Sequence, residues 1–194
     1  MHKRDFLTRS AVLGLLPVGS ARSAATDAAG PVLLTVSGDV GKVNRGPLDP
    51  VLDQMMAKHG ITFQKAFCFD APALRRLPSV TIGPTLEYDA KIHALAGPTL
   101  ESVLHAAGVG PGAAVQLGLR AVDGYNVIVS QQDARSYRMI IATHIDGQPL
   151  ALGGLGPQWA VYDADRLSAF KDKPLKERFG LCPWGLYHIG VRAA

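Results

Sequence analysis

The histidines are the side chains of this 194-residue chain best suited to bind a metal ion, but their spacing does not form a metal site. Five of them follow the first 25 positions, namely His59, His93, His105, His144 and His188. None belongs to a His-x-x-x-His or Cys/His cluster, and a zinc site needs three or four converging ligands. The sequence therefore predicts no metal site, either at His144 with Asp146 or elsewhere. A b-type haem held by His93 or His144 would rest on isolated histidines.

Two cysteines, Cys68 and Cys182, are the candidates for redox or disulfide chemistry. Neither stands in a Cys-x-x-Cys or Cys-x-x-Cys-His pattern, which argues against thioredoxin-like activity and c-type haem. An even pair in an oxidising compartment predicts a disulfide between Cys68 and Cys182, which would stabilise the fold by about 4–5 kcal/mol. Two buried free thiols are the alternative, and the sequence does not separate the two.

Patterns of other common enzyme sites are missing from the sequence. No Gly-x-Ser-x-Gly motif of a serine hydrolase occurs. The glycines of 108–112 follow an expected helix rather than a strand, and Pro111 lacks the N–H that a phosphate loop needs, which argues against dinucleotide binding. Glu87 and Asp89 have no second feature that would make them an acid–base pair, so we expect them on a solvated loop.

The stretch 153–162 combines backbone freedom with a large aromatic side chain. It reads Gly-Gly-Leu-Gly-Pro-Gln-Trp-Ala-Val-Tyr, so its backbone can approach a ligand, and Trp159 offers a flat apolar face with one donor. One interpretation makes Trp159 the wall of a cleft. The other places Trp159 in the core after a tight bend, because aromatic side chains are buried more often than they bind ligands.

The elements that must position these residues are many short strands and few short helices. Strands are expected at 32–38, 61–69, 80–85, 114–122, 125–130, 139–144, 159–162 and 187–191. Helices are expected at 51–59, 71–77, 100–107, near Tyr137 and at 165–170. Asp123-Gly124 is the strongest hairpin signal. Because there is no regular β-α-β alternation, the pattern predicts an α+β fold of mixed β-sheets with short peripheral helices.

The positive charge of the chain is concentrated at its N-terminus. The formal net charge is +4, and Lys3, Arg4, Arg9 and Arg22 supply most of it. The remainder is close to neutral and lacks the basic surface that nucleic acid requires. A basic start, a short apolar run at 11–18 and small residues at 20–25 are typical of a secretory signal peptide.

We therefore expect residues 1–25 to be a signal peptide and residues 26–194 to form a single domain that is periplasmic or secreted. Hydrophobic residues make up 47% of the chain, enough for one sizeable core. The apolar run is shorter than the roughly 20 residues of a membrane span, so no integral membrane protein is expected. An amphipathic N-terminal helix of the mature protein is the alternative. The segment 3–7 also resembles a twin-arginine export signal with Lys in place of the first Arg, which leaves the export route open.

Several segments occur in an order that resembles one known family. They are Val36-Ser37-Gly38-Asp39-Val40, Phe69-Asp70 followed by Leu77-Pro78, Ala96-Gly97-Pro98-Thr99-Leu100, Asp123-Gly124-Tyr125, Asp146-Gly147-Gln148-Pro149-Leu150, Gly156-Pro157-Gln158-Trp159 with Tyr162, and Trp184 to Val191. In this order the chain resembles a short exported member of the sulfite-oxidase-like family, the oxidoreductase molybdopterin-binding domain. The resemblance covers roughly residues 32–191. It implies the mixed-sheet fold of that domain and a cofactor cleft.

The resemblance fails at the residue that binds the metal. Catalytic members hold molybdenum through a Cys thiolate in the segment after the Leu-Pro motif, whereas residues 80–88 contain no Cys. Thr85 lies near the expected ligand position, and Tyr88 stands where short relatives carry Trp. A hydroxyl replaces a soft thiolate poorly at such a metal. We therefore expect no cofactor, and molybdopterin is implied by the resemblance alone.

Four residues are expected to line the inherited cleft and bind a ligand: Thr85, Tyr88, Tyr125 and Trp159. The first two come from the segment that carries the metal ligand in relatives, Tyr125 follows the hairpin turn, and Trp159 follows the glycine-rich bend. No catalytic residue is assigned. The sequence favours an exported, non-catalytic ligand-binding or accessory protein for a membrane-bound sensor or redox partner. A periplasmic molybdopterin-dependent oxidoreductase is the alternative.

Overall fold

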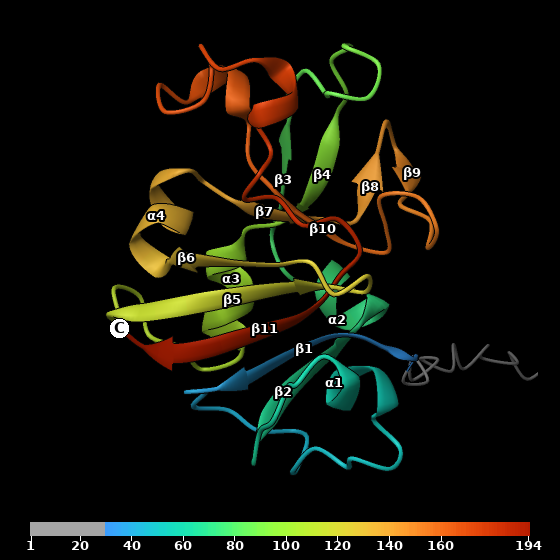
Figure 1. The fold of residues 1–194 in the computed structure, drawn as a ribbon, viewed down its shortest axis with the longest axis vertical. Coiled ribbons are helices and arrows are strands. Elements are labelled where there is room, and N and C mark those ends of the chain that lie inside the picture. The colour runs from blue at the N-terminus through green and yellow to red at the C-terminus, as the bar shows by residue number, and fades with distance from the viewer. Residues whose placement is uncertain (1–29) are drawn as a thin grey trace, which may run out of the picture.

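A computed structural model describes residues 30–194, which form a mixed α+β fold with three β-sheets and short helices (Figure 1). The expected class is therefore confirmed. The expected signal peptide, residues 1–25, lies outside the described residues.

The largest sheet has five strands and fills the lower half of the view in Figure 1. Its strands are β1 (Val32–Gly38), β2 (Ala66–Asp70), β5 (Val115–Ala121), β6 (Asn126–Ser130) and β11 (Leu186–Ala193), in the order β2-β1-β11-β5-β6. β1 and β11 are parallel, and the other neighbours are antiparallel. The hairpin between β5 and β6 turns at Asp123-Gly124, as expected, with Gly124 at a φ of 92°.

Two smaller sheets lie above it. One contains β3 (Ser79–Ile82), β4 (Leu95–Pro98), β8 (His144–Ile145) and β9 (Gln148–Pro149), and the other pairs β7 (Ile140–Ala142) with β10 (Trp159–Val161). β4 crosses close to β7, where a Cβ on Gly97 would collide with the carbonyl oxygen of Ile141. Glycine at position 97 therefore allows the two smaller sheets to pack together.

The helices are short and peripheral. They are α1 (Gln54–Lys58), α2 (Ala71–Arg75), α3 (Leu100–Ala106), α4 (Gln131–Ser136) and two 3-10 turns, η1 (Ala164–Arg166) and η2 (Leu175–Glu177). The expected N-cap of α3 is present, because the Thr99 hydroxyl accepts a hydrogen bond from the Ser102 N–H at 3.1 Å. Among residues 30–194, no helix is long and apolar enough to cross a bilayer.

Three expected elements differ from the structure. The strand expected at 61–69 begins only at Ala66, because Ile61 and Phe63 pack as irregular chain into a second small apolar cluster. The helix expected at 51–59 begins at Gln54, because the Asp49 carboxylate accepts the N–H groups of residues 51 and 52 in a preceding turn. The strand expected at 139–144 is divided between β7 and β8.

Candidate functional site

Two of the four expected cleft residues, Tyr88 and Tyr125, come together around a depression of about 280 Å³. Trp184, which precedes β11, and the buried Phe179 complete the aromatic lining. We call this site the aromatic depression. Glu87, Asp123 and Lys176 contribute charged groups to the lining. Thr85 and Trp159 do not line it.

The side chain of Trp159 is buried, with 1% of its surface exposed. Its indole N–H donates to the carbonyl oxygen of Cys182 at 2.8 Å, and its ring lies 6.0 Å from that of Phe179. The expectation that Trp159 lines a cleft is therefore wrong, and the alternative, a core position, is correct. From the core, Trp159 supports the segment 182–184 on which the aromatic depression is built.

The three exposed aromatic side chains of the depression present both apolar faces and polar ends. Tyr88 is 56% exposed, Tyr125 is 49% exposed and Trp184 is 38% exposed. The Tyr125 hydroxyl donates to the carbonyl oxygen of Gly180 at 2.8 Å, which ties the β5–β6 hairpin to the segment before Trp184. Partial burial, reinforced by the Glu87 carboxylate, raises the pKa of Tyr88 to about 12, so the phenol stays neutral. The depression thus suits a planar molecule with a few polar groups.

Tyr88 lies on loop 83–94, which connects β3 to β4, and Thr85 anchors one end of that loop. The N–H of Thr85 donates to Oδ2 of Asp165 at 2.7 Å, and Arg178 donates to Oδ1 of the same carboxylate at 2.7 Å. Thr85 also pairs with Ile92 across the loop. Thr85 therefore contributes a backbone anchor that positions the loop.

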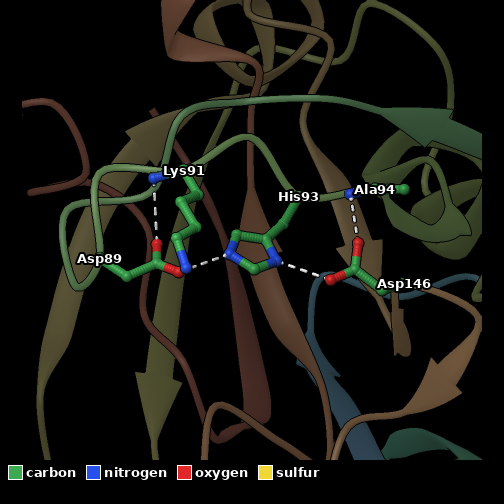
Figure 2. Close-up of polar contacts among 5 residues, drawn as sticks. All are labelled: Asp89, Lys91, His93, Ala94 and Asp146. Carbon is green, nitrogen blue, oxygen red and sulfur yellow. Dashed lines mark hydrogen bonds and ion pairs between the residues drawn. The ribbon is translucent and has the colours of Figure 1, made fainter.

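The other end of loop 83–94 is held by an imidazole between two carboxylates (Figure 2). Nδ1 of His93 lies 2.6 Å from Oδ2 of Asp146, and Nε2 lies 3.0 Å from Oδ2 of Asp89. The Ala94 N–H donates to the other oxygen of Asp146 at 2.9 Å, and the Lys91 N–H donates to the other oxygen of Asp89 at 3.1 Å. We call these three side chains, Asp89, His93 and Asp146, the His93 clamp.

The His93 clamp requires a protonated histidine. Both ring nitrogens face carboxylate oxygens, so both must carry hydrogen. Hydrogen bonds to Asp146 and to Asp89 raise the pKa of His93. Because both nitrogens are engaged, the alternative of haem ligation by His93 does not fit the structure. The sequence did not reveal the clamp, since Asp89 was expected on a solvated loop and Asp146 was considered only with His144, as a metal site that was rejected.

Cys68 and Cys182 are both free thiols, so the expected disulfide is not the arrangement in the structure. Cys68 lies on β2 near the lower end of the molecule, and loop 83–94 lies at the upper end (Figure 1). Cys182 lines the aromatic depression, but burial raises the pKa of its thiol to about 12. A molybdenum centre of the family type needs a Cys in the segment after the Leu-Pro motif, and residues 80–88 contain none. Cys182, the cysteine beside the loop, is buried, with 4% of its surface exposed. The residues present therefore do not fit such a centre.

Comparisons with known proteins bear on the fold. No protein-family model and no curated protein matched the chain. Among solved structures, the chain is similar to the sulfane dehydrogenase SoxCD from Paracoccus pantotrophus, with a TM-score of 0.53 and 14% sequence identity. The match covers 83% of this chain and 38% of that chain. At this identity the likeness concerns the fold alone.

Proposed function

We propose that this chain is an exported, sulfite-oxidase-like domain that binds a small planar molecule in the aromatic depression without using molybdenum. One observation carries the proposal. Three aromatic side chains are exposed among residues 30–194, namely Tyr88, Tyr125 and Trp184, and all three line the same depression. Exposed apolar side chains gathered in one hollow are characteristic of a binding site.

The walls of the aromatic depression are fixed independently of a ligand. Loop 83–94, which carries Tyr88, is held by the His93 clamp and by the bond from Thr85 to Asp165. Tyr125 is held through its hydroxyl by Gly180. A preformed site loses less conformational entropy on binding, so a shallow depression can still bind a small molecule.

A domain that binds a molecule without a redox centre of its own acts through another protein. The basic and apolar pattern of residues 1–25 supports export. The likeness to the fold of a dehydrogenase supports a partner that carries out redox chemistry. We therefore assign the chain an accessory role, presenting its ligand to a membrane-bound sensor or redox partner.

Fluorescence titration of the full-length chain tests the site. Trp159 is buried and Trp184 is exposed, so a planar ligand in the depression should quench Trp184. We expect saturable quenching by pterin or caffeine, the planar probes, and none by glucose. Tyr88→Ala should weaken binding of these probes about tenfold, whereas Val51→Ala, which removes an exposed apolar group elsewhere, should not. Absence of quenching, or equal binding by Tyr88→Ala, would contradict the proposed site.

Elemental analysis of protein purified after export tests the absence of molybdenum chemistry. We expect no stoichiometric molybdenum, because loop 83–94 contains no Cys and Cys182 beside it is buried. Stoichiometric molybdenum would overturn the proposal in favour of a molybdopterin-dependent oxidoreductase.

A further inference from the structure

A second and larger cavity lies apart from the aromatic depression. Its volume is about 740 Å³, and it is bounded by β3, the C-terminal end of α4 and the turn at 163–167. β3 is the outer strand of its sheet, so its edge away from β4 is free of any strand partner among the described residues. No residue lines both this cavity and the aromatic depression. Its volume is that of a typical small-molecule site.

Arg138 lines this cavity in a backbone conformation that arginine rarely adopts. Its φ is 51°, and it occupies the position just after the end of α4. The N–H of Met139 donates to the carbonyl oxygen of Ala134 at 3.0 Å, and the N–H of Arg138 donates to that of Arg135 at 3.0 Å. This Schellman arrangement normally has glycine where Arg138 stands, because glycine avoids the steric penalty of positive φ. A strained arginine facing a cavity suggests a functional reason for its side chain.

The cavity holds more positive than negative charge. Arg135 and Arg166 also line it, and each forms an ion pair with a carboxylate of the lining: Arg135 with Glu101 at 3.6 Å, and Arg166 with Asp163 at 3.4 Å. None of the ion pairs among residues 30–194 includes Arg138. Three guanidinium groups therefore line the cavity with two carboxyl groups, and guanidinium groups are suited to carboxylate and phosphate oxygens. We call this site the arginine cavity.

Asp163 adds a carboxylate to the cavity, and one of its two oxygens has no hydrogen-bond partner. The residue is 9% exposed and lines the cavity, and its Oδ1 is buried without any hydrogen-bond partner. The other oxygen faces the N–H of Gly83 at 3.4 Å. A buried acceptor without a partner destabilises the fold, so a donor from a bound molecule would relieve the cost. Ile82 and Leu167 supply apolar surface beside it.

We propose that the arginine cavity is a second binding site, which takes a small organic carboxylate or phosphate whose body also carries an N–H or O–H donor. The oxyanion is bound by the arginines, with Arg138 as the central cation. The donor reaches Asp163, and the apolar body packs on the wall at Ile82 and Leu167. The site is independent of the aromatic depression and of the function proposed for it.

Calorimetric titration of the full-length chain with four probes tests the ligand class. We expect benzoate and phenyl phosphate to bind and neutral benzamide not to bind. Binding by both anions, or by one alone, identifies which oxyanion the cavity accepts. We expect 4-aminobenzoate to bind more tightly than benzoate, and Asp163→Ala, which removes the acceptor, to remove that difference. Equal binding of benzamide, or no binding of either anion, would overturn the proposal, and an unchanged preference in Asp163→Ala would overturn the role of Asp163.

Arg138→Gly separates a binding role from a structural one. Glycine relieves the positive φ, so the variant should melt at a higher temperature than the parent chain. Its affinity for the binding anion should nevertheless fall about tenfold, since a charge-assisted hydrogen bond is lost. Arg75→Ala, which removes an exposed arginine at the end of α2, should change neither property. Undiminished anion binding by Arg138→Gly would refute the assignment.

Discussion

The side chains of His93 and Asp146 meet at 2.6 Å, although the two residues are 53 positions apart in the sequence. Their contact ties the loop that carries Tyr88 to the turn between β8 and β9 (Figure 2). The loop that carries Tyr88 is thus fixed by an imidazolium between two carboxylates.

The His93 clamp predicts a specific dependence of stability on pH. Because the pKa of His93 is raised in the folded chain, its stabilisation is complete below pH 6.5 and is lost as the pH rises through the higher folded value. The pKa values of Asp89 and Asp146 are lowered, so their contribution is complete above pH 3.8 and is lost at lower pH. Urea unfolding at a series of pH values measures the free energy of unfolding of the parent chain and of His93→Gln. The parent chain should exceed the variant by the largest amount between pH 3.8 and pH 6.5. His105→Gln, on the exposed side of α3, is the matched variant. A difference that stays constant from pH 5 to 9 would rule out the clamp.

His188 predicts the opposite slope at lower pH. Burial, with a smaller effect of Arg120, lowers its pKa from 6.5 to about 4, and its Nε2 lies 2.8 Å from the Ser37 hydroxyl. Between these pH values the unfolded chain binds a proton that the folded chain does not, so stability falls as the pH falls. The free energy of unfolding should decrease by about 3 kcal/mol across this range. In His188→Gln the decrease should be much smaller, and an equal decrease in this variant would show that other groups cause it.

The two tryptophans should differ sharply in their effect on stability. Trp159→Phe leaves the Cys182 carbonyl oxygen without its donor and opens a cavity, so we expect a loss of about 2–4 kcal/mol. Trp184→Phe, at a site 38% exposed, should cost less than about 1 kcal/mol. Guanidinium unfolding measures both. Comparable losses in the two variants would be inconsistent with a core role confined to Trp159.

The two thiols should react at different stages of unfolding. Cys68 is half-buried, whereas Cys182 is buried and its thiol pKa is raised to about 12. We expect alkylation of the native chain by iodoacetamide to modify Cys68, and modification of Cys182 to require denaturant. Mass spectrometry without reductant reports both. A chain that takes no label even when denatured would instead contain the disulfide.

The sequence was informative where the signal is local. The hydroxyl of Thr99 caps α3, and Asp123-Gly124 forms the hairpin turn, because cap and turn chemistry depend on a few adjacent residues. The sequence could not separate Trp159 from Trp184. Their burial depends on packing between β10 and the segment 182–184, which lie apart in the chain.

The His93 clamp and the role of Arg138 could not be predicted from the sequence either, because both depend on contacts between residues that lie far apart in the chain. The sequence suggested Asp146 only as a turn residue and as a partner of His144, whereas the structure brings it to His93 through the antiparallel pairing of β4 with β8. Nothing in the sequence distinguishes Arg138 from the other arginines. Its significance lies in its positive φ and in the cavity that it faces, neither of which residue type reveals.

The parallel pairing of β1 with β11 has a consequence for biosynthesis. β1 lies in the interior of the five-stranded sheet, between β2 and β11, so one of its edges stays open until residues 186–193 are available to pair with it. The chain therefore completes its main sheet only after β11 has been synthesised. Until then it presents a bare, apolar strand edge that chaperones can recognise.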